Sequence, residues 1–148
     1  MRRFGGLAAA LAALASLLVG LAVLAAPTPA PQESHQPADS LVVSLRVIGP
    51  DGAPLWPEAS HVLEAGNATA LEPLLAGAAD AGMVVETESY PGMGTYVRAI
   101  GEHRARGASG WLYEVERDGQ VLRGDRAADA FGLAAGDTLV WRWSADGA

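Results

Sequence analysis

Apolar and polar residues alternate with a period of two in four stretches of the chain. They are residues 41–48 (LVVSLRVI), 96–100 (YVRAI), 111–117 (WLYEVER) and 138–143 (TLVWRW). This alternation is typical of strands that bury one face. Tight-turn residues follow two of them, at Pro50-Asp51-Gly52 and at Asp118-Gly119. We predict strands at these four places and another from His61 to Glu64 that pairs back on the first as a hairpin.

One stretch follows the helical period instead. Thr69 and Glu72 have the spacing of a capping box, in which each side chain accepts a hydrogen bond at the start of a helix. Gly82 is placed to end that helix in the left-handed conformation. The sequence therefore predicts a helix from about Ala70 to Ala81. Its apolar face consists of Leu71, Leu74, Leu75 and Ala78.

The order of these elements predicts the fold class. Two strands, one helix and then several strands give an α+β fold, in which one helix packs on a mixed, mostly antiparallel sheet. We expect the first and last strands to lie side by side in the middle of the sheet. That arrangement is a β-grasp-like roll.

The first 26 residues differ from the rest of the chain. Arg2 and Arg3 precede an apolar run that reaches Ala26, and the run ends in Val23-Leu24-Ala25, with small residues where a signal peptidase cleaves. Residues 1–26 are therefore either a signal peptide or an N-terminal membrane anchor, since about 20 apolar residues can span a bilayer. Both alternatives predict an exported protein, secreted or anchored outside the cytoplasm. Contact with the membrane is expected only through this segment, if it is not cleaved.

Residues 27–40 are rich in proline and alanine and predict an extended linker. This leaves residues 41–146 as one folded domain. The 148-residue chain has a formal net charge of -7 and contains no cysteine. The acidity argues against a nucleic-acid partner, because phosphates would be repelled, and the lack of cysteine excludes disulfides and thiolate chemistry.

Four motifs occur in a recognisable order. They are T-x-L-x-x-L-L at 69–75, G-x-Y-V-x-x-I-G at 94–101, G-W-L-Y-x-V at 110–115 and L-x-x-G-D-x-L-V-W-x-W at 133–143. In these motifs the chain resembles the DUF4430 family, which is similar to the C-terminal β-grasp domain of transcobalamin and intrinsic factor. The resemblance covers the folded part of the chain and implies cobalamin or another corrinoid as a ligand.

The chain departs from that family in two ways. Residues 115–119 (VERDG) replace a compact Asn-Gly turn, and we expect a longer acidic turn there. The helical barrel that forms the other half of the vitamin B12 site in transcobalamin has no counterpart in the sequence. A corrinoid is therefore implied as a ligand, and no cofactor is predicted firmly.

The aromatic residues are the main candidates for a binding site. Trp111 and Tyr113 share one face of their strand, and Trp141 and Trp143 share a face of the last one. They either form the core or, with Tyr96 and Tyr90, line an exposed platform for a flat apolar ligand. Our candidate ligand-binding residues are Tyr96, Trp111 and Tyr113. The loop Pro91-Gly92-Met93-Gly94 would allow the backbone to approach such a ligand closely.

Histidine and arginine offer weaker candidates. His103 is expected to be a solvated loop residue, although an imidazole also suits a cobalt ion as an axial ligand. Arg104 and Arg106 either bind an anionic group or keep the loop soluble. No nucleophile elbow, phosphate loop or histidine pair at metal-binding spacing occurs, so we expect neither an enzyme nor a metal site.

Two functional hypotheses follow. The first is an exported, non-catalytic module that binds a small, flat, amphipathic ligand such as a corrinoid. The second is a cell-surface structural or protein-interaction module, which meets a protein partner through a sheet edge or loops.

Overall fold

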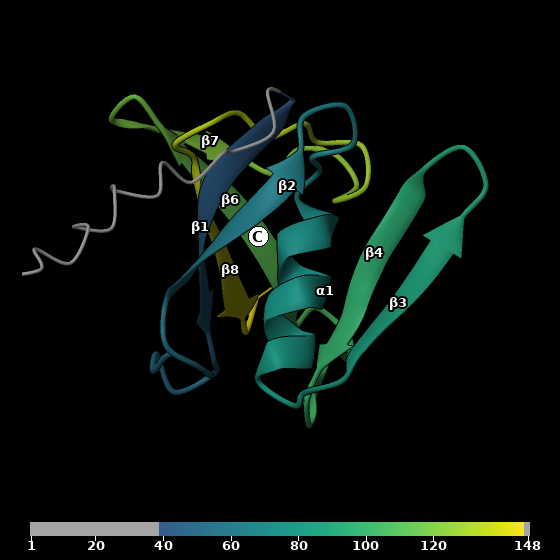
Figure 1. Cartoon of the computed structure of the whole chain (residues 1–148). Coiled ribbons are helices and arrows are strands. Elements are labelled where there is room, and N and C mark those ends of the chain that lie inside the picture. The colour runs from purple at the N-terminus through teal and green to yellow at the C-terminus, as the bar shows by residue number, and fades with distance from the viewer. Residues whose placement is uncertain (1–38, 147–148) are drawn as a thin grey trace, which may run out of the picture. The chain divides into compact units, whose positions relative to one another are not determined.

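The computed structural model describes residues 39–146 (Figure 1). The predictions for residues 1–26 and for the linker before Asp39 lie outside these residues. The elements, in chain order, are β1 (Ser40–Ile48), β2 (Ala59–Glu64), α1 (Leu71–Asp80), β3 (Val85–Tyr90), β4 (Gly94–Ile100), β5 (His103–Arg104), β6 (Gly110–Arg117), β7 (Gln120–Arg123) and β8 (Thr138–Ser144). No helix among residues 39–146 is long and apolar enough to cross a membrane.

Five strands form the main sheet, in the order β2-β1-β8-β6-β7. The first and last strands, β1 and β8, run parallel in the middle, from the pair Ser44 and Thr138 to the pair Ile48 and Arg142. All other pairs in this sheet are antiparallel. The α+β class and the predicted central position of the first and last strands are confirmed.

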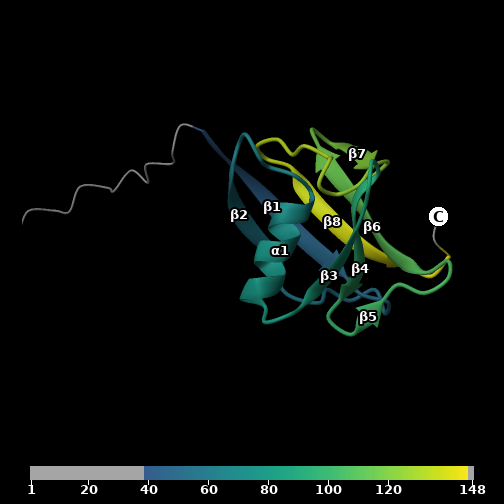
Figure 2. The same ribbon diagram turned by 90° about the vertical axis from the view of Figure 1, so that its right-hand side faces the viewer.

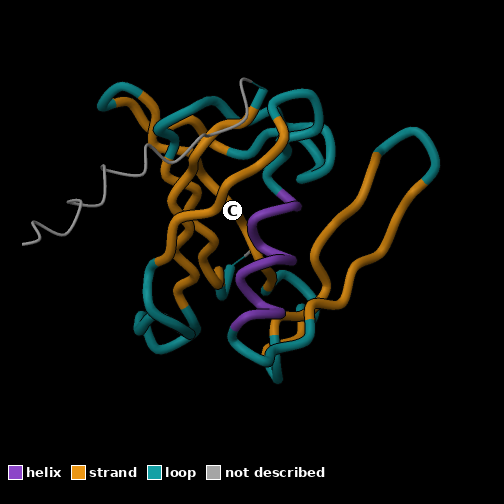
Figure 3. The backbone as a smooth tube through the Cα atoms, viewed as in Figure 1, coloured by secondary structure: helices purple, strands orange, loops and turns teal. Residues whose placement is uncertain are grey.

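Helix α1 covers one face of the sheet at β1 and β2 (Figures 1 and 3). Beside the helix, β3 and β4 form a hairpin that crosses β6 (Figure 2). With β5 they make a second, three-stranded sheet in the order β3-β4-β5. This second sheet was not predicted, and β5 lies in a segment that the sequence predicted to be a loop.

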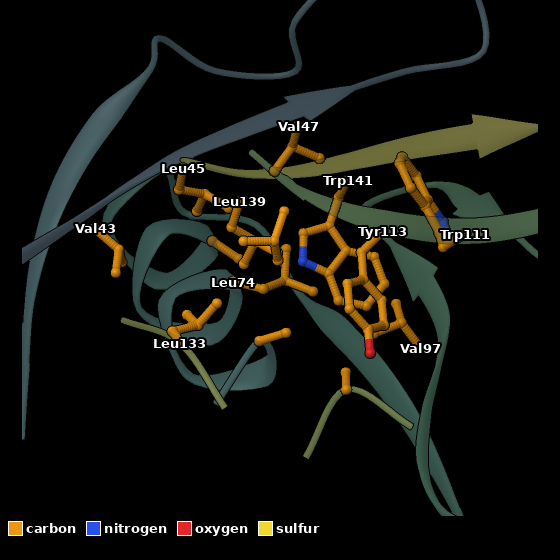
Figure 4. Packing of buried hydrophobic residues seen from close by; sticks show 14 of the residues in the cluster. Val43, Leu45, Val47, Leu74, Val97, Trp111, Tyr113, Leu133, Leu139 and Trp141 are labelled. Atoms are coloured by element: carbon orange, nitrogen blue, oxygen red, sulfur yellow. The ribbon is translucent and has the colours of Figure 1, made fainter. Parts of the chain in front are cut away.

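The core lies between the main sheet, the helix and the hairpin (Figure 4). The inward side chains of β1 and β8 are almost completely buried, as the alternation predicted. The most deeply buried large side chains include Leu45, Val47, Leu74, Leu139 and Trp141. Each such aliphatic side chain contributes roughly 1.5–3 kcal/mol to folding.

The predicted capping box does not form. Helix α1 begins after Ala70, and no side chain accepts a hydrogen bond at its N-cap. Thr69 instead forms an isolated β-bridge with Gly132, and Ala70 donates its N–H to the carbonyl of Phe131 at 3.0 Å. Tertiary pairing therefore takes the place of the local cap. The end of the helix is as predicted, because Gly82 adopts a φ of 67°.

The turn between β6 and β7 is shorter than expected. Arg117 pairs directly with Gln120, so only Asp118 and Gly119 lie between the strands. Both have positive φ, 50° and 76°, as a two-residue hairpin turn requires. The expected longer acidic turn is therefore wrong, and Asp-Gly serves as the compact turn that leads into the unpredicted strand β7.

Candidate functional site

The three predicted site residues lie together. Tyr96 on β4 and Trp111 and Tyr113 on β6 all line one small cavity of about 90 Å³ where the hairpin crosses the main sheet. Arg126 and Ala128, from the segment that follows β7, also line it. Residues from three separate parts of the chain therefore meet at this point.

The three residues differ in exposure. Trp111 is 7% exposed and Tyr113 is 9% exposed, so both belong to the core, whereas Tyr96 is 40% exposed. Figure 4 shows Tyr113 beside Trp141, with ring centroids 5.1 Å apart, and Trp111 at the end of the cluster. The two β6 aromatic residues thus mainly pack the fold, and Tyr96 is the aromatic residue of the three that reaches the surface.

The polar atoms of the two buried rings are occupied by the protein itself. The Trp111 indole N–H donates to the carbonyl of His103 at 2.9 Å, and the Tyr113 hydroxyl donates to the carbonyl of Arg126 at 2.8 Å. Burial, with a smaller contribution from the Asp125 charge, raises the pKa of Tyr113 to about 12. These two side chains would therefore contact a ligand through the surfaces of their rings rather than through hydrogen bonds.

A larger groove adjoins this cavity and shares Tyr96 and Trp111 with it. It measures about 460 Å³ and lies between the β3–β4 hairpin and the segment that leads into β6. Tyr90 and Tyr96 meet edge to face in it, with centroids 5.8 Å apart. Met93, at the tip of the hairpin, is 60% exposed. Small side chains, Ala105 and Ala108, line the opposite wall.

In the glycine-rich tip of the hairpin, Gly94 packs against the protein, whereas a Cβ atom on Gly92 would meet nothing within 4 Å. A Cβ atom on Gly94 would come within 2.5 Å of the Ala127 Cβ and 2.7 Å of the Asp129 Oδ1. Asp129 also accepts the N–H of Thr95 at 3.0 Å, and this hydrogen bond lowers the pKa of the carboxyl group. The base of the tip is therefore anchored to the segment that follows β7.

His103 is half-buried rather than solvated. It lies on β5, and its ring centroid is 6.5 Å from that of Trp111 and 6.4 Å from that of Trp143. It lines a separate cavity of about 360 Å³ with Arg104 and Arg106. Arg104 pairs with Glu86. Among residues 39–146, no group of three potential metal ligands is found.

A cavity on the outer face of the main sheet escaped the sequence analysis. It measures about 360 Å³ and is lined by Leu112, Arg123, Arg142 and Trp143, among others. Arg142 donates from Nε to Glu114 Oε1 at 2.8 Å, while no carboxylate among residues 39–146 forms an ion pair with Arg123. Alternation along β6 predicts that Leu112 points to the face opposite that of Trp111. Nothing in the sequence, however, showed that β7 would bring Arg123 beside Leu112.

Comparison with known proteins supports the fold and no more. No family model and no curated protein matches the chain. A protein of Ruminococcus gnavus described as a candidate metal-binding protein matches with a TM-score of 0.49 and 18% identity, over 70% of this chain and 96% of that one. Haptocorrin, solved in complex with Cbi, matches with a TM-score of 0.59 and 16% identity, over 71% of this chain.

The chain spans only 25% of the length of haptocorrin. At 16% identity the match shows a shared fold. The match supports the resemblance to the transcobalamin family as a similarity of fold. Membership of the DUF4430 family stays a prediction.

Proposed function

We propose that this protein is exported and that its folded domain is a non-catalytic module that binds a flat, amphipathic molecule. The groove between the β3–β4 hairpin and the start of β6 is the binding site in this proposal. The observation that carries it is the joint exposure of Tyr96 and Met93 beside a groove of about 460 Å³. Ligand pockets are typically concave, of this size, and lined mainly by apolar and aromatic side chains.

The lining of the groove favours a flat ligand. Tyr90 and Tyr96 present ring surfaces, and the flexible thioether of Met93 can adapt to an irregular apolar surface. Ala105 and Ala108 leave room on the opposite wall because their side chains are short. Trp111 also lines the groove, and its indole N–H is already bonded within the protein.

Cobalamin or another corrinoid is the first candidate ligand. Its support is the resemblance of the four sequence motifs to a transcobalamin-like family and the shared fold with haptocorrin, which was solved with Cbi. His103 does not line the proposed groove. Binding of a corrinoid in the groove therefore does not require His103 to coordinate cobalt. The proposal includes no catalytic step.

The test is a titration of the full-length protein with cobinamide and with cyanocobalamin. Tryptophan fluorescence and the absorption of the corrinoid would report binding, which we expect in the micromolar range or tighter. Tyr96→Ala and Met93→Ala should each weaken binding about tenfold, because they remove exposed groove contacts. Trp111 and Tyr113 are unsuitable for truncation, since their loss would damage the core.

Val62→Ala is the matched control. Val62 is apolar and 64% exposed, yet it lies on β2 and does not line the groove. Equal binding by this variant and the unchanged protein is expected. If neither corrinoid binds at high micromolar concentration, the corrinoid proposal is wrong.

The second candidate is a protein-interaction module. The observation that favours it is a section of edge on the main sheet, next to the same groove, with which no strand among residues 39–146 pairs. Such edges can accept a strand from another polypeptide.

A further inference from the structure

The main sheet is incomplete along one half of β6. Along the edge that faces away from β8, β6 pairs with β7 only from Glu114 to Arg117. Among residues 39–146, no strand pairs with that side of Gly110–Tyr113. Because Gly124 already donates to the Tyr113 carbonyl, the open edge of the sheet is short, at Gly110–Leu112, directly in line with β7.

The open edge presents main-chain hydrogen-bonding groups. The carbonyl of Tyr113 accepts the N–H of Gly124 at 2.9 Å, on the side that faces away from β8. Residues two apart in an antiparallel strand direct their N–H and C=O groups to the same side. The N–H and C=O of Trp111 consequently point out of the open edge, where a strand added beyond the end of β7 would meet them.

Side-chain cavities lie on both faces of this edge. The apolar groove of about 460 Å³, with Tyr96 and Met93, borders it on the inner face, and Trp111 forms part of its lining. The cavity of about 360 Å³, with Arg123 and Arg142, borders it on the outer face at Leu112. A strand laid along the edge would direct its side chains alternately into these two cavities.

The two cavities differ in chemistry. The inner groove is lined mainly by aromatic and apolar side chains, with Arg98 and Ser109 as its polar members. The outer cavity carries two arginines and one carboxylate, Glu114, which is already paired with Arg142. Arg123 has no ion-pair partner among residues 39–146. Among the residues that line this cavity, the positive charges therefore exceed the negative ones by one.

We propose that the open edge of β6 binds an extended polypeptide by β-strand addition. The bound segment has an apolar residue opposite Trp111, which enters the inner groove, and an acidic residue opposite Leu112, which pairs with Arg123. Main-chain hydrogen bonds supply affinity in this mode, and the alternating side chains supply specificity. The proposal goes beyond the binding of a small ligand and does not depend on it.

The test uses a synthetic peptide of alternating glutamate and valine, about eight residues long, acetylated and amidated at its ends. Binding to the full-length protein would be followed by the amide chemical shifts of Trp111 and Tyr113 in isotope-labelled protein. We expect saturable binding with the largest shift at the Trp111 amide. The same peptide, N-methylated at alternate residues so that its edge amides cannot donate, should bind about tenfold more weakly.

A charge exchange tests the outer cavity. Arg123→Glu should weaken the glutamate peptide about tenfold and strengthen an otherwise identical lysine peptide. The matched control is Arg106→Glu, because Arg106 also lacks an ion-pair partner among residues 39–146 but lines a different cavity. Arg123 is exposed, so its replacement should not alter folding.

Three results would overturn the proposal: no shift at Trp111, equal binding of the N-methylated peptide, or equal effects of the two arginine variants. A cobinamide titration of the same samples separates the two proposals. The peptide and cobinamide should compete if both occupy the inner groove. Failure of the peptide to bind would leave the corrinoid result unaffected.

Discussion

Arg117 and Asp137 form a double hydrogen bond between the end of β6 and the turn that enters β8. The Arg117 Nε lies 2.8 Å from Asp137 Oδ1, and its Nη2 lies 2.6 Å from Oδ2. The Asp137 carboxylate is buried, and it also accepts the N–H of Ala134 at 2.8 Å. The hydrogen bond to Asp137 raises the pKa of Arg117. This ion pair joins β6 to the turn that enters β8, one of the two central strands of the main sheet.

Asp137→Asn should lower the free energy of unfolding by about 2 to 4 kcal/mol, because it removes the charge from a buried, fully bonded carboxylate. Urea denaturation measures this difference. Asp125→Asn is the control, since Asp125 is exposed and its contact with Arg126 is 3.3 Å long. The prediction fails if the two variants are equally stable.

The ionisation of Tyr113 should limit stability at high pH. Because burial raises its pKa to about 12 in the folded protein, against an ordinary value of 10.0, the folded state retains a proton that the unfolded state releases. The stabilisation is complete below about pH 10 and is lost as pH rises toward 12. Absorbance of tyrosinate should show a step near pH 12, and Tyr113→Phe should remove that step. Tyr90, whose hydrogen bond with Glu88 also raises its pKa, should still titrate in the variant. A step near pH 12 that survives in both Tyr113→Phe and the double variant with Tyr90→Phe would contradict the assignment.

Gly124 lies against the ring of Tyr113. A Cβ atom on Gly124 would come within 2.5 Å of the Tyr113 Cζ, and the ring cannot move freely because it packs on Trp141 and Phe131. Gly124→Ala should therefore lower the free energy of unfolding by about 1 to 3 kcal/mol. Thermal unfolding measures the effect. Gly66→Ala is the control, because a Cβ atom there meets nothing within 4 Å.

Asp129 should hold the hairpin in place. Its carboxylate accepts the Thr95 N–H, and this bond lowers the pKa of Asp129 below its ordinary value of 3.8. The contribution of this hydrogen bond to stability is fully present above pH 3.8 and is lost as the pH falls below that value. Asp129→Ala should increase amide hydrogen exchange in β3 and β4 and leave β1 and β8 unchanged, whereas Asp118→Ala should have no effect on the hairpin. Unchanged exchange in β4 would show that other contacts anchor it.

The order of most elements and the buried face of each long strand could be predicted from the pattern of residues alone. Alternation predicted that Leu45, Val47 and Leu139 point into the core, because side chains of a strand alternate between its two faces. The placement of Gly82 predicted the end of the helix, since glycine adopts positive φ without steric cost. Alternation also predicted that Trp111 and Tyr113 share one face of β6, and Tyr96 reaches them from a strand of the second sheet.

The residues that lie beside each buried face could not be predicted in this way, because they depend on long-range contacts. The start of α1 is held by pairing with the segment around Gly132, so the local capping signal of Thr69 was overridden. Strand β7 is too short for its alternation to be recognised, and with it the outer cavity at Arg123 was missed. The division between buried Trp111 and exposed Tyr96 depends on how the hairpin crosses β6. Such crossings arise from contacts between residues far apart in the chain, which a local pattern does not contain.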